Sequence, residues 1–156
     1  MTRLLPYFSF QGRTNRRRYW ETAVTIFMLF FLVMLVFGEL SRLPVIGILF
    51  GILLIGVTVA AYVAVLANGS RRLHDRGKSA WWLLLFAGAP ALLSALRGLV
   101  TLGGGPDADG PAALLALITL GFSIWALVEL GILKGTVGPN RFGDDPLGKP
   151  LEEIFA

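Results

Sequence analysis

The sequence predicts an all-α, polytopic membrane protein in which four transmembrane helices form two antiparallel hairpins. The first observation is a set of four stretches that carry no charged residue over at least 17 positions: Thr22–Gly38, Leu43–Ser70, Ser79–Leu96 and Gly110–Val128. Each is long enough to cross a bilayer core, which takes about 20 apolar residues. The second is composition, because 55% apolar residues and a mean hydropathy of +0.71 exceed what a soluble domain carries.

The third observation is that basic residues fall on alternate loops. Of 14 Lys and Arg, twelve lie in the N-terminal segment, the middle loop or the C-terminal tail. Only Arg42 and Arg97 lie in the other two loops. Because positive residues near membrane ends are retained in the cytoplasm, this split predicts that both termini of the protein are inside. The anionic inner leaflet suits these charges, so we expect membrane lipids and no nucleic acid as partners.

At 156 residues, the chain has room for a single membrane domain over 1–156. We expect an interfacial segment at 1–20, where aromatic residues and arginines alternate, and a cytoplasmic tail at 134–156. The expected spans are 21–38, 44–68, 79–97 and 111–133. Pro90 is expected to kink the third span, and the glycines between Arg97 and Pro111 favour an irregular linker.

Small residues recur along one face of the second span. Gly47 and Gly51 stand four apart, and so do Gly56 and Ala60, which begin five residues after Gly51. Such residues let membrane helices approach closely. Two interpretations stay open, which are packing within the bundle and a homo-oligomer formed through this face.

The densest polar cluster lies between the second and third spans, from Asn68 to Ser79. If the second helix continues into it, Asp75 lies one turn from both Arg71 and Arg72 and can pair with either. Gly77 then ends the helix. His74 and Asp75 are sequence neighbours that point about 100° apart on a helix, which is unsuitable for a proton relay. We therefore expect a structural or ligand-orienting hydrogen bond from His74 and no catalytic residue.

Two further polar features need partners. The tail from Gly138 to Gly148 has the composition of a tight turn and includes Asn140, Asp144 and Asp145. We expect an ion pair between Asp144 or Asp145 and Arg13, Arg16 or Arg71, the alternative being a divalent cation. Glu129 lies at membrane depth, where a carboxylate must snorkel, pair with an arginine or act as a proton or ligand site.

Metal and redox chemistry find little support in the composition. The chain has no Cys, which removes disulfides and thiolate ligands, and His74 is its single histidine. We expect no metal site and no cofactor.

Three motifs resemble those of a known family. They are Phe10-Gln11-Gly12-Arg13 with Arg16, Tyr19 and Trp20; Arg71-Arg72-Leu73-His74-Asp75 with Gly77, Ser79 and Trp81-Trp82; and Gly138 with Asn140, Phe142-Gly143 and Asp144 or Asp145-Pro146. In this order they resemble the bacterial inner-membrane family called domain of unknown function 805, with Ala80 where the family more often has glycine. The resemblance implies a small polytopic, multi-pass protein of the bacterial cytoplasmic (inner) membrane and no particular activity.

The leading hypothesis is a non-enzymatic membrane module with an arginine-rich cytoplasmic surface that binds an anionic lipid headgroup or partner. Guanidinium groups suit this role because they hold phosphate or carboxylate in a bidentate manner. The surface would comprise Arg13, Arg16, Arg71, Arg72, His74 and Asp75. The alternatives are charges that only neutralise one another, a transporter or channel subunit acting as an oligomer, and an enzyme on lipid-linked phosphate.

Overall fold

The computed structural model describes residues 5–40, 44–103, 105 and 108–148. It contains a short helix α1 (Leu5–Phe8) and four long ones, α2 (Arg16–Leu40), α3 (Pro44–Asp75), α4 (Ala89–Gly103) and α5 (Asp109–Ala126). Two π-helical segments extend the last two helices: η1 (Leu84–Gly88) precedes α4, and η3 (Leu127–Ile132) follows α5. No β-strand occurs within these ranges.

Four helical stretches are long and apolar enough to cross a membrane. They are Arg16–Gly38, Gly47–Asp75, Leu84–Gly103 and Asp109–Ile132. The all-α class and the number of candidate spans are therefore confirmed. The direction in which the chain is inserted stays a prediction.

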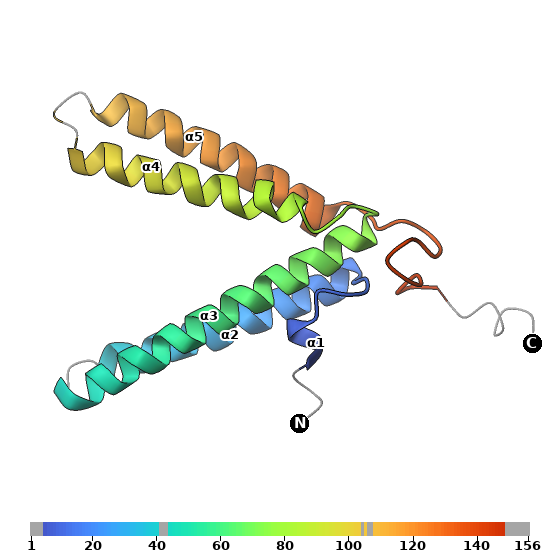
Figure 1. Cartoon of the computed structure of the whole chain (residues 1–156), viewed down its shortest axis with the longest axis horizontal. Coiled ribbons are helices and arrows are strands. Elements are labelled where there is room, and N and C mark those ends of the chain that lie inside the picture. Colours follow the sequence, from blue (N-terminus) through green and yellow to red (C-terminus); the bar gives the residue numbers. More distant parts are fainter. Residues whose placement is uncertain (1–4, 41–43, 104, 106–107, 149–156) are drawn as a thin grey trace, which may run out of the picture.

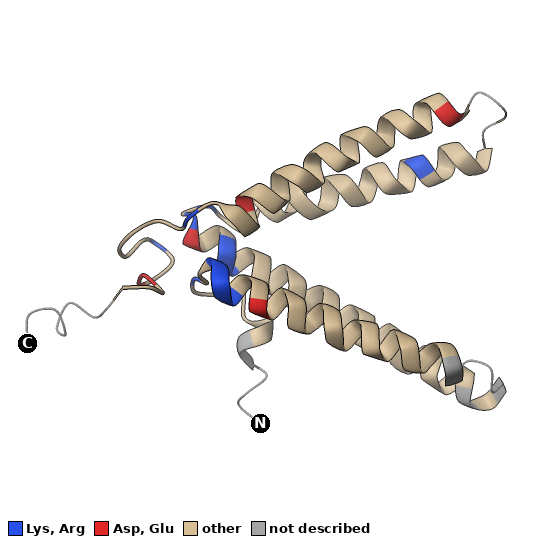
Figure 2. Cartoon of the chain, turned by 180° about the vertical axis from the view of Figure 1, so that it is seen from behind, with Lys and Arg blue, Asp and Glu red and all other residues tan. Residues whose placement is uncertain are grey.

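The helices lie in two pairs that together form a V (Figure 1). α2 packs along α3, and α4 packs along α5. The two pairs meet at one end, where η3 contacts both α2 and α3, and diverge towards the other. We call the end where they meet the polar end, because most of the charged residues gather there (Figure 2).

Local signals explain where the helices begin and end. The Asn15 side chain accepts a hydrogen bond from the Arg18 amide (2.9 Å), which caps the first turn of α2. At the end of α3, the Lys78 amide bonds the Leu73 carbonyl and the Gly77 amide bonds the His74 carbonyl. This is the Schellman pattern, and the φ of +70° at Gly77 explains why glycine stands there.

Several helix bounds differ from those predicted. α2 already begins at Arg16, directly after the Asn15 cap. α3 runs on to Asp75, because Arg72 and Asp75 in its last turn find partners inside the protein. The third span covers Leu84–Gly103 instead of 79–97, so the predicted irregular linker is partly helical. Pro90 lies directly after the π turn, where Ala89 bonds the Leu84 carbonyl five residues back.

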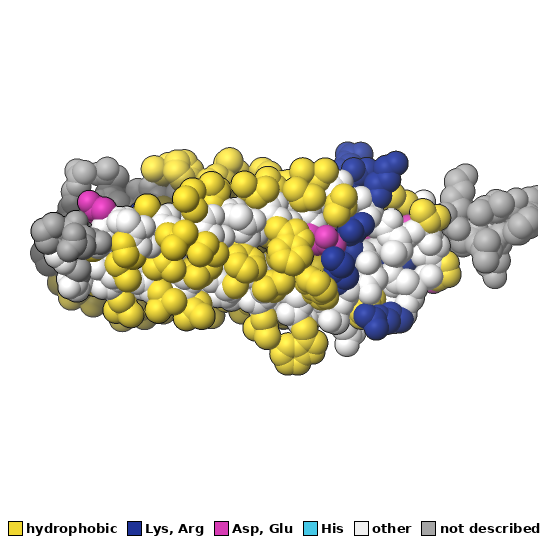
Figure 3. All heavy atoms as spheres, turned by 90° about the horizontal axis from the view of Figure 1, so that it is seen from above, with side chains coloured by type: hydrophobic (Ala, Val, Ile, Leu, Met, Phe, Trp, Pro, Cys, Tyr) yellow, Lys and Arg dark blue, Asp and Glu magenta, His cyan; other side chains and the backbone are white. Residues whose placement is uncertain are grey.

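The buried core is small and lies near the polar end. Leu73, Phe86 and Leu130 form it, with Tyr19 and Trp82 packed against them. Farther along the helices most apolar side chains are exposed, and Figure 3 shows them covering the length of the molecule. Such a surface suits contact with lipid chains.

Two glycines of the small-residue face of α3, Gly51 and Gly56, are not at close helix contacts. A Cβ added at Gly51 or Gly56 would meet no atom within 4 Å. Packing within the bundle therefore does not account for these two glycines. A homo-oligomer through Gly47, Gly51, Gly56 and Ala60 stays a prediction.

Candidate functional site

The polar end brings together three segments that are far apart in the sequence. These are the stretch before α2, the turn between α3 and η1, and the chain that follows η3. The Thr14 amide donates to the Arg71 carbonyl (3.2 Å), and the Thr136 amide donates to the Asp75 carbonyl (2.7 Å). Backbone hydrogen bonds thus hold the first and third segments against the end of α3.

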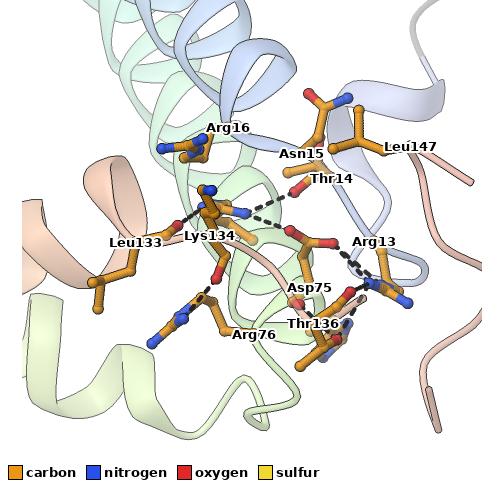
Figure 4. Close-up of polar contacts among 12 residues, drawn as sticks. Arg13, Thr14, Asn15, Arg16, Asp75, Arg76, Leu133, Lys134, Thr136 and Leu147 are labelled. Carbon is orange, nitrogen blue, oxygen red and sulfur yellow. Dashed lines mark hydrogen bonds and ion pairs between the residues drawn. The ribbon is translucent and has the colours of Figure 1, made fainter. Parts of the chain in front are cut away.

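Asp75 is the centre of this assembly. Its carboxylate pairs with Arg13 (3.1 Å) and Arg72 (2.5 Å), and its side chain is only 4% exposed. Arg13 also donates to the carbonyls of Thr136 (2.6 Å) and Gly138 (2.6 Å), as Figure 4 shows in part. One carboxylate therefore links the N-terminal segment, α3 and the tail.

Arg72 is fully buried and forms hydrogen bonds in several directions. Besides Asp75, its guanidinium donates to the carbonyls of Leu130 (2.8 Å), Leu133 and Thr14 (3.5 Å). The last turn of a helix leaves such carbonyls without helical partners. Arg72 therefore stabilises the end of η3 and joins the two helix pairs.

Glu129 forms a second ion cluster beside the first. Its carboxylate, 5% exposed, pairs with Arg76 (3.0 Å) and Lys78 (2.8 Å). The Lys78 ammonium also lies 4.5 Å from the centre of the Trp82 ring. Of the alternatives left open for Glu129, the structure shows pairing, with one arginine and one lysine that come from the turn after α3.

His74 is held by the tail and by the N-terminal segment. Its ring stacks on Phe142 with 4.0 Å between centroids, and its Nδ1 lies 3.1 Å from the Gly12 carbonyl oxygen. Asn140 donates to the His74 carbonyl (3.0 Å). This arrangement fits the structural hydrogen bond expected of His74.

The expected tail ion pair does not form. Among the described residues, neither Asp144 nor Asp145 lies within ion-pair distance of an arginine. Asp145 instead accepts hydrogen bonds from the amides of Leu147 (3.0 Å) and Gly138 (2.8 Å). These two bonds hold the pKa of Asp145 below its usual value, the Leu147 amide having the larger effect. An Asx turn closed by the Leu147 amide, together with the bond from the Gly138 amide, has taken the place of the predicted pairing.

The alternative of a cation at these two carboxylates gains no third acidic or histidine ligand from the fold. Within the described ranges, no group of three such side chains is placed to hold a metal ion. The same holds for Asp75, whose carboxylate is occupied by two guanidinium groups.

Two glycines allow close approaches at the polar end, Gly131 of η3 to α2 and Gly135 of the tail to α3. A Cβ at Gly135 would collide with the Asp75 carboxylate, and a Cβ at Gly131 would lie 2.7 Å from the Trp20 ring. The Trp20 indole donates to the Gly131 carbonyl (3.1 Å). Neither glycine stood out in the sequence, because a lone glycine does not reveal which side chain will lie against it.

Sequence reasoning also missed small polar residues that join the segments. Asn68 donates to the Tyr19 carbonyl (3.0 Å), and Ser70 donates to the Phe10 carbonyl (3.3 Å). Both are buried, as is Thr14. In the sequence, Asn68 and Ser70 differ from their neighbours only as polar residues at the end of an apolar run. A polar side chain that is buried must find a hydrogen-bond partner.

The six residues predicted as a binding surface divide into two groups. The side chains of Arg13, Arg72 and Asp75 are buried, with both arginines bonded to Asp75, and the His74 ring is stacked on Phe142. Arg16 and Arg71 remain partly or fully exposed. Arg16 lines a cavity of about 270 Å³ with Asn15, Lys134 and Leu147, and Figure 4 shows Leu147 beside Asn15.

Five exposed or half-exposed cations at the polar end have no carboxylate partner among the described residues. We call them the free cations: Arg16, Arg18, Arg71, Lys134 and Arg141. Arg16 donates to the Ile132 carbonyl (2.9 Å) and Arg141 to the Gly77 carbonyl (3.2 Å), so their positive charges are not neutralised. In contrast, Glu21, Asp75 and Glu129 each pair with a basic side chain.

A family profile matches most of the chain, including the residues that form the Asp75 and His74 contacts. The profile of the family described as "Protein of unknown function (DUF805)" matches residues 7–144. The chain belongs to this family. The motifs that suggested the family in the sequence are those that supply the Asp75 and His74 contacts.

Curated relatives agree with this assignment. The chain is 28% identical over 147 residues to Inner membrane protein YhaH of Escherichia coli (strain K12), covering 94% of both proteins. It is 31% identical over 144 residues to Uncharacterized protein YiiR of the same strain, covering 88% of this chain and 86% of YiiR. No solved structure matches it. The four apolar helices and these relatives make the chain a multi-pass inner membrane protein.

Proposed function

We propose that this protein is a non-enzymatic membrane module whose polar end faces the cytoplasm and binds anionic lipid headgroups. In this orientation both termini are cytoplasmic. The orientation is supported by the excess of Lys and Arg in the segments that meet at the polar end.

One observation carries the proposal, which is the imbalance of charge at the surface of the polar end. The buried carboxylates are satisfied by buried or half-buried cations, whereas the five free cations have no acidic partner among the described residues. An anionic bilayer surface supplies the missing negative charge, at about 1 kcal/mol for each Lys or Arg near it.

The same geometry argues for binding rather than catalysis. Asp75 and Glu129 are each held between two cations, so their carboxylates are already occupied by partners within the protein. The His74 ring is stacked on Phe142 and its Nδ1 lies against a backbone carbonyl. A general acid or base must instead reach the reacting atom of a substrate.

The proposal is tested by thermal unfolding in neutral detergent with phosphatidylglycerol or phosphatidylcholine added. We expect phosphatidylglycerol to raise Tm more than phosphatidylcholine does, and salt to reduce the difference because it screens surface charges. Arg16→Gln with Lys134→Gln should reduce the shift. Arg97→Gln, a cation of the opposite end of the molecule, serves as the control and should retain it. Equal shifts with both lipids would overturn the proposal.

A further inference from the structure

A groove runs along the α2–α3 pair, and α1 covers it at one end. It encloses about 360 Å³. Thr25, Leu29 and Val33 of α2 form one wall, Val57, Ala60 and Ala64 of α3 the other, and Tyr7 and Phe8 of α1 cover the end nearer the polar end. From Thr25 to Val33 the helix rises about 12 Å, which is close to the depth of one leaflet of a bilayer core.

The groove is hollow because small residues line its α3 side. Ala60, Ala61 and Ala64 stand where larger side chains would fill the space against α2. Besides Tyr7 at the end covered by α1, the one polar side chain in the lining is Thr25, whose hydroxyl already donates to the Glu21 carbonyl (2.7 Å). A molecule that lies along the groove must therefore be apolar.

Two free cations extend the walls of the groove at the polar end. Arg18 precedes Thr25 by seven residues and Arg71 follows Ala64 by seven, so each lies two turns farther along the same helix face. Arg18 and Tyr7 both lie within electrostatic range of the Arg71 guanidinium. Neither arginine has a carboxylate partner among the described residues, so an anion placed between them would relieve their repulsion.

We propose that this groove binds one anionic phospholipid of the inner leaflet, with part of an acyl chain between α2 and α3 and the phosphate between Arg18 and Arg71. The inference rests on the proposed function, and it assigns that function to one place. A lipid fits because the groove is apolar along its length and cationic at one end, as an amphiphile requires. A helix of a second copy would match the apolar walls but leave the two arginines without a counter-charge.

Native mass spectrometry of the full chain, with phosphatidylglycerol or phosphatidylcholine as the probe, tests the site. We expect wild type to retain one phosphatidylglycerol in preference to phosphatidylcholine. Arg18→Gln with Arg71→Gln should weaken retention about tenfold or more, since two charge-assisted contacts are lost. The matched control is Arg17→Gln with Arg97→Gln, which removes the same charge. Arg17 pairs with Glu21 (2.7 Å), and Arg97 lies away from the polar end.

A second pair of variants tests whether an acyl chain lies in the groove between α2 and α3. Ala61→Phe fills the groove and should reduce retention, whereas Ala113→Phe places the same side chain on an exposed position of α5 and should not. Thermal unfolding without lipid verifies that each variant is folded.

The outcomes separate the two proposals. If both charge-removing pairs weaken phosphatidylglycerol retention equally, or if Ala61→Phe has no effect on it, the groove is not the lipid site. General binding of anionic lipid at the polar end would remain. Equal retention of the two lipids would overturn both. A lipid-free dimer that Ala61→Phe dissociates would replace the lipid with a second copy.

Discussion

Replacing Asp75 with asparagine tests whether the buried charges hold the two helix pairs together. The substitution keeps the shape of the side chain and removes its charge. An asparagine can present its oxygen to Arg13 or to Arg72, but its amide group then faces the other guanidinium, donor to donor. Both arginine side chains are at most 1% exposed, so water does not replace the lost partner.

The cost follows from the burial of the three groups. Removing one partner of a buried ion pair leaves an uncompensated charge and costs about 3–5 kcal/mol. Three hydrogen bonds from guanidinium groups reach the Asp75 carboxylate, which places this site within that range. For a chain of 156 residues, the loss corresponds to a fall in Tm of roughly 6–20 °C.

The assay is thermal unfolding of the purified protein in nanodiscs, followed by tryptophan fluorescence. Asp144→Asn is the matched control, because it removes the same charge from an exposed position and should change stability by about 0.5 kcal/mol or less. If Asp75→Asn melts at the temperature of Asp144→Asn, the carboxylate does not hold the segments together and the reasoning fails.

Three smaller predictions concern the tail. Gly135→Ala should prevent the tail from docking, since its Cβ would collide with the Asp75 carboxylate; unchanged proteolysis of the tail would contradict this. Phe142→Ala should lower the free energy of unfolding by about 0.5–1.5 kcal/mol for the lost stacking on His74, and further for the lost burial, as measured by thermal unfolding. Phe142→Tyr should keep most of this stability. Because the folded pKa of Asp145 is depressed, its stabilisation is present above the unfolded pKa of about 4 and is lost as pH falls through the folded pKa. The protection of the Leu147 amide, measured as its exchange rate relative to the intrinsic rate at the same pH, should therefore be lost at low pH in wild type and be absent at all pH values in Asp145→Ala; equal protection in the two proteins would refute the role of the carboxylate.

Features of the fold that depend on nearby residues could be predicted from the sequence. The uncharged runs located the four spans, and the three-residue spacing of Arg72 and Asp75 predicted their ion pair. Gly77 was recognised as the end of α3 because its position after the helix favours a left-handed conformation.

Features that depend on contacts between distant segments could not be predicted. Arg13 reaches Asp75 across 62 residues and takes the place expected for Arg71. Arg72 bonds the carbonyls of Leu130 and Leu133, and no side-chain pattern marks which carbonyls a helix end will expose. The prediction that Asp144 or Asp145 would pair with an arginine was wrong because nearby amides of the turn satisfy Asp145 first. Sequence spacing reveals neighbours on one helix, whereas these contacts are set by how three segments meet.

The most direct test of the account is the side of the membrane on which the polar end lies. The chain has no cysteine, so Ser9→Cys, Ser79→Cys, Gly105→Cys and Leu147→Cys each provide a unique thiol. In spheroplasts, a membrane-impermeant maleimide should label only the Gly105→Cys variant, and the other three should react after the membrane is opened. Labelling of Ser9→Cys, Ser79→Cys or Leu147→Cys from outside would contradict a cytoplasmic polar end built from all three segments.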